Sequence, residues 1–236
     1  MDVDRRLEQL CERVTLVEGE GNPRRGKLCV MSFVALLAGE DHTDHPASAS
    51  PLIRNFALWI NDAMPRDVRQ RLKPFAVRIL GTNDGCDQAR AEVLRHALAG
   101  EILPRIEGEW RAVQVSGRHS SPFESLIVRA IRQDFELRAV SLLARIEQGM
   151  APSALGSAVG ELLSLCIREA ATPDRRARYW NEAMELLDRL CDAGTRPCQQ
   201  SILGGQVERA EERLGRPLLS GIRKLMPVFN KALASF

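Results

Sequence analysis

The sequence has few aromatic residues, almost no net charge and no long apolar run. Aromatic residues make up 5% of the 236 residues, which argues against the stacking platforms that bind single-stranded nucleic acids. The 33 basic and 31 acidic residues leave a net charge of +2, so no overall field steers the chain onto DNA or an anionic membrane. No run approaches the ~20 apolar residues that span a bilayer. We therefore predict no membrane association.

Paired cysteines and a secretion signal are also missing. The six cysteines are scattered without a CxxC pair, and Cys29, Cys166 and Cys191 stand in apolar helical runs. A free thiol in such a run behaves as a small buried hydrophobe, which indicates a reducing compartment rather than a disulfide framework. The charged segment 1–14 has no apolar core or cleavage site of a signal peptide. We predict a cytoplasmic protein.

What the sequence does contain is helical periodicity along most of its length. Apolar residues recur with helical spacing, whereas no segment alternates apolar and polar residues over the length of a strand. The sequence therefore predicts an all-α protein, an irregular multi-helix bundle of about nine or ten helices. The expected helices span 4–14, 28–38, 51–63, 65–79, 87–113, 121–148, 155–171, 172–192, 199–214 and 217–234. The segment 18–26, rich in glycine, is expected to be a loop.

Several residues mark where these helices begin, end or bend. Gly39 is expected to end the second helix, because glycine tolerates the left-handed conformation that follows a helix. Ser50 and Pro51 form a typical helix start, with serine at the N-cap and proline at the first helical position. Pro74 and Pro104 are expected to kink or split their helices, since proline lacks the amide donor.

A polar stretch at 115–120 marks the predicted boundary between two helical domains, 1–116 and 120–236. A capping box follows it, in which Ser121 and Glu124 would each satisfy a free backbone donor. One continuous domain is the alternative organisation.

Carboxylates and imidazoles crowd into one short segment after the second helix. The residues are Glu40, Asp41, His42, Asp44 and His45. Imidazole and carboxylate together suit zinc, manganese or iron(II), and His96 or His119 could add a ligand from elsewhere. The spacing is not that of an HExxH motif. The other interpretation is structural, because aspartates in such loops cap helix ends and a histidine before Pro46 fills a turn.

Basic residues form three clusters. They are Arg24, Arg25 and Lys27; Arg66, Arg69, Arg71 and Lys73; and Arg175, Arg176 and Arg178. The second cluster lies on a predicted amphipathic helix, and a solvated face explains such clusters. If two clusters were adjacent in space, they would instead form a site for phosphate backbones.

The segment 24–110 carries a series of short motifs: Cys29-Val30-Met31, Ala38-Gly39-Glu40, Asp44-His45-Pro46, Ser50-Pro51, Asn61-Asp62 and Gly81-Thr82. In these motifs it resembles a family of uncharacterised bacterial proteins that is common in actinobacteria. Family members show a similar "AGE…DHP" segment, a "WND" helix and a "GT" ending. The resemblance implies no activity.

Two positions depart from this family pattern. An aromatic residue would be usual at His42, and Ile60 stands where the family tryptophan would be, with Trp59 one place earlier. The first departure weakens a two-histidine metal site. It favours a structural role for Asp44 and His45, such as tying their loop to the helix that carries Asn61.

From the sequence we therefore expect a non-catalytic helical binding protein that acts on another macromolecule. A protein is the expected partner, and no cofactor is expected. The alternatives are a metal-dependent hydrolase using the Glu40–His45 segment with a divalent metal, and a nucleic-acid-binding protein using the arginine clusters. The sequence is also compatible with a homo-oligomer.

Overall fold

The computed structural model describes most of the chain. The described residues are 3–116, 133, 134, 137, 138, 141, 144, 145, 148–170, 172–194 and 199–214. His119, the predicted capping box and the expected helix at 217–234 lie outside these residues. So does most of the expected helix at 121–148. The predicted division at 116–120 borders the same region and stays a prediction.

The all-α class is confirmed. The helices are α1 Val3–Arg13, α2 Val30–Ala38, α3 Pro51–Ala63, α4 Arg66–Arg69, α5 Lys73–Ile79, α6 Asp87–Ala97, α7 Leu103–Ser116, α9 Pro152–Glu169, α10 Pro173–Asp192 and α11 Gln199–Arg213. Eight of them, counted within the described ranges, have nine or more residues, so the predicted nine or ten is too high. One reason lies in the single kinked helix expected at 65–79. Three short elements take its place, namely α4, a 3-10 turn η2 (Gln70–Leu72) and α5, and each has fewer than nine residues.

The predicted helix signals operate as expected. Gly39 ends α2 with φ 75° and donates its N–H to the carbonyls of Ala35 and Leu36. Ser50 is the N-cap of α3, and its hydroxyl accepts from the amide of Ile53. A short π-helical segment, η3 (Leu98–Ile102), separates α6 from α7 just before Pro104, which is the predicted split.

A small sheet lies in and around the segment 18–26 that the sequence predicted as a loop, so the expectation of no strand is wrong there. It consists of β1 Thr15–Leu16, β2 Gly21–Asn22 and β3 Lys27–Leu28, with a 3-10 turn η1 (Pro23–Arg25) between β2 and β3. β3 lies in the middle, parallel to β1 and antiparallel to β2. Two-residue strands are too short to show an alternating pattern, and this is why the sequence did not reveal them.

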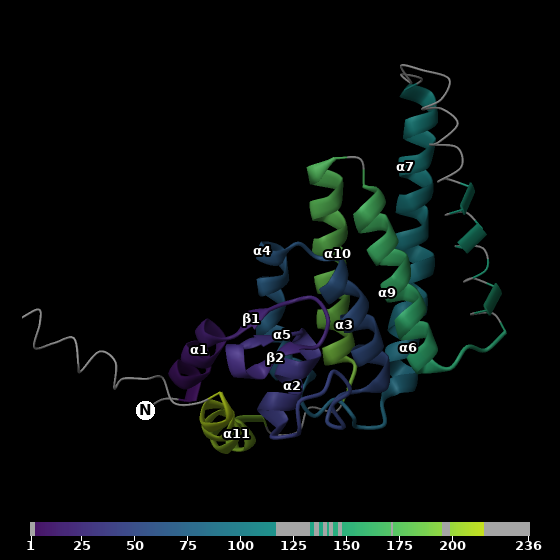
Figure 1. Ribbon diagram of the computed structural model, residues 1–236. Helices are drawn as coiled ribbons and strands as arrows, with labels where there is room; N and C mark the ends of the chain where they lie inside the picture. Colours follow the sequence, from purple (N-terminus) through teal and green to yellow (C-terminus); the bar gives the residue numbers. More distant parts are fainter. Residues whose placement is uncertain are drawn as a thin grey trace, which may run out of the picture.

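The helices divide between two ends of the molecule. Figure 1 shows α7, α9 and α10 at one end and α1 with α11 at the other, and α11 contacts both α1 and α2. Between them lies α2, whose residues from Val30 to Leu37 are all buried. This burial explains its continuously apolar sequence, because a helix enclosed on all sides has no polar face.

The closest packing in the described structure joins α3 to α9, which lie side by side (Figure 1). A Cβ atom at Gly156 would come within 3.0 Å of the carbonyl group of Leu52, and one at Gly160 would lie 2.9 Å from the Cβ of Trp59. Ser164 donates its hydroxyl to the carbonyl of Trp59 at 2.9 Å. Residues later in α3 contact residues later in α9, since Leu52 meets Gly156 and Trp59 meets Ser164. The two helices therefore run parallel.

None of the helices in the described residues is long and apolar enough to cross a membrane.

Candidate functional site

The predicted metal segment is built around internal hydrogen bonds. The carboxylate of Glu40 accepts from the backbone amides of Ala47 at 2.7 Å and Ser48 at 2.9 Å. Arg213 of α11 donates to the carbonyls of Gly39 and Glu40. Glu40 therefore braces its own loop, and α11 holds the loop from outside.

The structure brings together only one pair of the predicted ligands. Nδ1 of His45 contacts Oδ1 of Asp44, and the amide of His45 donates to Oγ1 of Thr43 at 3.0 Å. Asp41 and His42 are exposed on the same loop. Within the described ranges, no group of three or more His, Cys, Asp or Glu side chains is placed to hold a metal ion. The geometry of this loop fits the structural interpretation.

The expected contact between this loop and the Asn61-Asp62 pair is not among the hydrogen bonds of either residue. Asn61 instead donates to the carbonyl of Val17 at 3.0 Å and accepts from the amide of Val30 at 3.2 Å. Asp62 accepts from the amide of Gly19 at 3.1 Å. Both side chains therefore fasten the link between β1 and β2 to α3, and Asn61 also holds the start of α2.

Two side chains of the second basic cluster donate hydrogen bonds to backbone carbonyls within the fold. Arg69 is buried and donates to the carbonyls of Asn61 at 2.7 Å and Met64 at 2.8 Å. Lys73 donates to the carbonyl of Cys11 at 2.9 Å. Arg69 therefore serves the end of α3 and is not presented to a phosphate. The exposed residues of the three basic clusters are Arg24, Arg25, Lys27, Arg66, Arg71 and Arg178.

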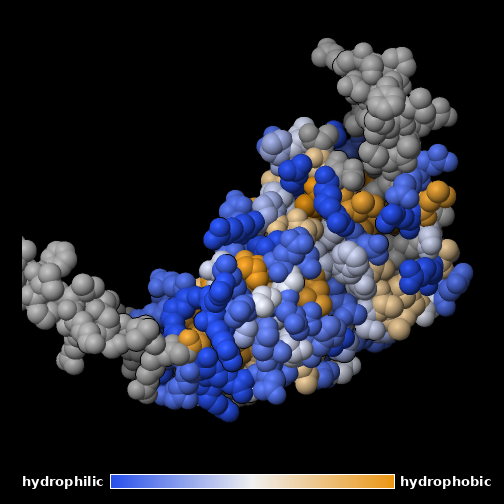
Figure 2. Space-filling model, in the orientation of Figure 1, coloured by the Kyte–Doolittle hydropathy of each residue, from blue (hydrophilic) through white to orange (hydrophobic). Residues whose placement is uncertain are grey.

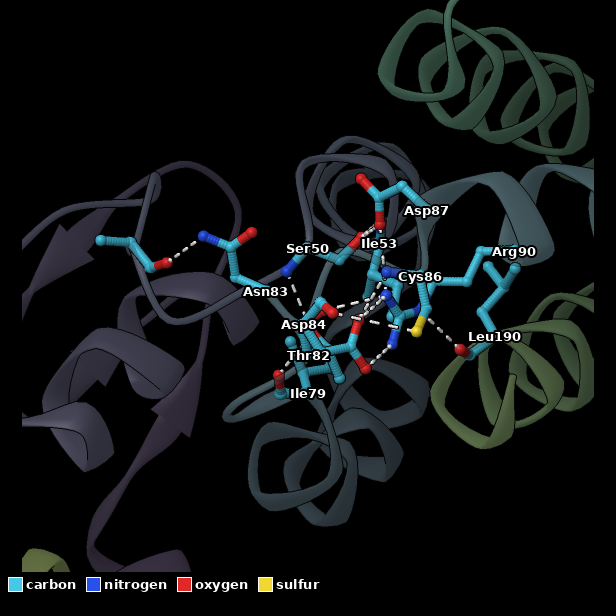
Figure 3. Close-up of polar contacts among 11 residues, drawn as sticks. Ser50, Ile53, Ile79, Thr82, Asn83, Asp84, Cys86, Asp87, Arg90 and Leu190 are labelled. Carbon is cyan, nitrogen blue, oxygen red and sulfur yellow. Dashed lines mark hydrogen bonds and ion pairs between the residues drawn. The ribbon is translucent and has the colours of Figure 1, made fainter. Parts of the chain in front are cut away.

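The most deeply buried charge is Arg90 of α6, which is 0% exposed. Its two terminal nitrogens donate to the two carboxylate oxygens of Asp84 at 2.6 and 2.8 Å. It also donates to the carbonyls of Thr82 at 2.9 Å and Leu190 at 3.1 Å, and to Asp87 at 3.2 Å. Figure 3 shows these groups converging on the guanidinium.

This Arg90 cluster extends to the start of α3. The hydroxyl of Ser50 donates to Asp87 at 2.5 Å, and the amide of Ser50 donates to Oγ1 of Thr82 at 3.0 Å (Figure 3). The cluster thus joins α3, the turn before α6, α6 itself and α10. Since the guanidinium is enclosed and its nitrogens are hydrogen-bonded, we assign the cluster to structure rather than to chemistry.

Acid should weaken the Arg90 cluster through Asp84. The hydrogen bonds from Arg90 lower the pKa of Asp84 to about 2, and its side chain is 10% exposed. The contribution to stability is present above the ordinary pKa of 3.8 and is lost as pH falls toward 2, because the unfolded chain takes up the proton first. We expect urea unfolding between pH 5 and pH 2 to show a loss of about 2 kcal/mol in the native chain that is absent in Asp84→Asn. Equal losses in both would contradict this assignment.

A second buried acid, Glu182, lies on α10. It is 5% exposed, its Oε2 pairs with Arg105, and its Oε1 has no hydrogen-bond partner. Burial raises the pKa of Glu182, and burial also raises the pKa of the nearby Tyr179 hydroxyl and Cys166 thiol. All three groups are enclosed, so they offer little surface to a substrate.

An open cleft of about 390 Å³ runs beside Trp59, between α3 and α9. It is lined by Glu18, Asn55, Leu58, Trp59, Asp62, Ala63, Ser157, Ser164 and Arg168. We call it the Trp59 cleft. Trp59 is 36% exposed, and the Nε1 of its indole donates to the hydroxyl of Ser157 at 2.9 Å. This bond and the close packing of Gly160 fix the ring at the edge of the cleft.

One end of the Trp59 cleft carries its charges. Glu18 and Asp62 supply two carboxylates and Arg168 supplies one guanidinium, which leaves a formal charge of −1. The parallel helices α3 and α9 end nearby, at Ala63 and Glu169, and the C-terminal end of a helix carries partial negative charge. This end of the cleft is therefore acidic.

A second cleft, of about 460 Å³, lies between α5 and α10. Its lining includes Arg71, which donates to Asn181 at 3.0 Å. Arg78 of the adjoining α5 is paired with Asp188 and Asp192 of α10. Arg71 and Arg78 therefore hold η2 and α5 against α10. The polar side chains of this cleft are less free to bind a ligand than those of the Trp59 cleft.

The sequence carried part of the signal for the Trp59 cleft. Trp59 lies off the face of α3 that carries the buried Ile53, Phe56 and Ile60, so its exposure agrees with helical spacing. Gly156 and Gly160 are four residues apart, a spacing that allows close helix contact. Glu18 and Arg168 are separated by most of the chain, and nothing local indicates that they meet.

Comparison with family models, with curated proteins and with solved structures finds no match to this chain. The functional argument therefore rests on the geometry of the Trp59 cleft.

Proposed function

We propose that this protein is a non-catalytic binding protein that recognises a partner protein through the Trp59 cleft. The observation that carries the proposal is an exposed tryptophan held rigidly at the edge of an open cleft. Tryptophan and arginine are enriched among residues that dominate binding energy, and Trp59 and Arg168 both line this cleft. A side chain that is already fixed loses little conformational entropy on binding.

The hydropathy of one face and the exposed apolar residues support this choice. In Figure 2 the visible face is mostly hydrophilic, with apolar patches that are small and separated. Among the described residues, Trp59 and Leu137 are the large apolar side chains that are exposed. Trp59 differs from Leu137 in being hydrogen-bonded into a fixed position.

The proposal extends to the setting in which the protein acts. We place it in the cytoplasm, supported by the free thiols of Cys11, Cys29, Cys86 and Cys166. The function needs no metal or other cofactor. We also retain the relation to the uncharacterised bacterial family as a proposal, on the residues quoted for it.

Replacing Trp59 with alanine tests the function directly. We expect cross-linking capture and quantitative mass spectrometry to recover a partner with the native chain that Trp59→Ala fails to recover. Once that partner is purified, its Kd should be about 30-fold weaker or more for Trp59→Ala, as for a dominant interface residue. The matched control is Leu137→Ala, which removes another exposed apolar side chain.

Thermal unfolding of both variants will show whether the fold is retained. A partner that binds the native chain and a folded Trp59→Ala variant equally would contradict the proposal.

A further inference from the structure

We infer that the partner places a basic side chain, arginine or lysine, against the face of Trp59 at the acidic end of the cleft. This inference rests on the proposed function and specifies the ligand chemistry of the same site. It concerns the charges around one aromatic ring, which can be tested without knowing the partner.

The first support is the balance of charge in the Trp59 cleft. Glu18 has no hydrogen bond or ion pair among the described contacts of its side chain, so its carboxylate is available. Asp62 accepts from Gly19 and, at 2.8 Å, from Asn61. These neutral donors leave the negative charge of Asp62 in place. Against these two carboxylates stands the single guanidinium of Arg168, so a cation is favoured over an anion.

The second support is the direction of the two helices. Because α3 and α9 run parallel, both point their C-terminal ends toward the end of the cleft that holds Asp62 and Arg168. The carbonyl ends of helices attract cations. Arg69 already binds two carbonyls at the end of α3, and Arg176 donates to the carbonyl of Ala170 at the end of α9 at 3.4 Å. The helix ends therefore add to the two carboxylates and do not replace them.

The third support is the way the indole is held. The bond from Nε1 to Ser157 engages the edge of the ring and leaves exposed surface on Trp59. Tryptophan is the best aromatic partner for a cation, and the attraction comes from the face of the ring. A guanidinium stacked there would lie close to the carboxylates of Glu18 and Asp62, which line the same cleft.

An acidic or phosphorylated segment fits less well. Arg168 could pair with one anion, but two carboxylates lining the same cleft would repel it. In our inference, Arg168 instead donates to a carbonyl or carboxylate of the partner. That acceptor lies next to the partner's basic side chain, on the same segment.

The test uses the full chain labelled with ¹⁵N at its three tryptophans. The indole N–H signal of Trp59 is assigned by its loss in Trp59→Phe. Nα-acetyl-arginine amide is then titrated at millimolar concentration, with the citrulline amide as an uncharged probe of nearly the same shape. We expect the Trp59 signal to shift saturably with the arginine probe and much less with citrulline.

A matched pair of variants tests the role of charge. Glu18→Gln should weaken the arginine probe by about two- to five-fold, the range of an exposed ion pair. Glu20→Gln removes an exposed acid from the same turn, outside the residues that line the cleft, and should leave binding unchanged. Raised salt should weaken the arginine probe and not the citrulline probe.

Two results would overturn the inference: equal shifts with arginine and citrulline, or a stronger response to Nα-acetyl-aspartate amide. Partner capture that depends on Trp59 would still uphold the proposed function in either case, leaving only the ligand chemistry wrong. Partner capture that is independent of Trp59 would instead remove the function itself.

Discussion

Replacing Arg90 with methionine should lower the free energy of unfolding by about 3–5 kcal/mol. Methionine fills much of the same space but donates no hydrogen bond. Asp84 would keep a largely buried carboxylate without its bidentate partner, and the carbonyls of Thr82 and Leu190 would lose their donor. Urea unfolding followed by circular dichroism at pH 7 measures the loss. The free-energy cost of leaving such buried groups unpaired exceeds the net stabilisation that their hydrogen bonds contribute when they form.

The matched control lies on the same helix. Arg95→Met removes an arginine from α6 that is partly exposed, and its effect should stay within about 0.5 kcal/mol. Arg90→Lys should also destabilise the protein, because an ammonium cannot reproduce the two parallel bonds to Asp84. If Arg90→Met and Arg95→Met unfold at the same urea concentration, the Arg90 cluster does not stabilise the fold.

The comparison of Arg90 with Arg95 shows where sequence reasoning ends. Both are arginines of one amphipathic helix, and Arg90 stands four residues before Leu94 on its buried face. The contact of Arg90 with the carbonyl of Leu190, one hundred residues further along the chain, has no local signal. Helix ends were predictable because their causes are local, as at Gly39 and Ser50. Contacts between distant segments leave no such trace.

In the candidate site, too, local features were predictable and contacts between distant segments were not. The exposure of Trp59 agrees with its position off the buried face of α3. The Glu40 to His45 segment attracted attention by composition, yet Glu40 spends its carboxylate on two amides of its own loop. Arg69 looked like a surface cation in the sequence and is buried against the end of α3. Residue type suggested chemistry in these two cases, and burial decided the role.

Replacing Gly156 with alanine should destabilise the protein by about 1–3 kcal/mol. The added Cβ would come within 3.0 Å of the carbonyl group of Leu52 and 3.2 Å from its Cα. Both belong to the backbone of α3, so no side chain can turn aside to relieve the contact. The helices must move apart, which loosens packing along their whole interface.

Gly108→Ala is the matched control, because Gly108 also lies within a helix but has no atom within 4 Å of an added Cβ. Alanine there should stabilise the protein by about 0.5–1 kcal/mol, since glycine weakens a helix interior. The two substitutions are chemically identical, so opposite signs in thermal or urea unfolding would isolate the contact with α3. A stabilising Gly156→Ala would show that α9 does not approach α3 this closely.

The consequence reaches the proposed binding site. The same approach of α9 brings Ser157 to Trp59 and Gly160 against its Cβ. In Gly156→Ala at a temperature where it remains folded, we expect the Trp59 indole signal to move and the arginine probe to bind more weakly. Gly108→Ala should change neither, because helix stability alone does not set where the indole lies.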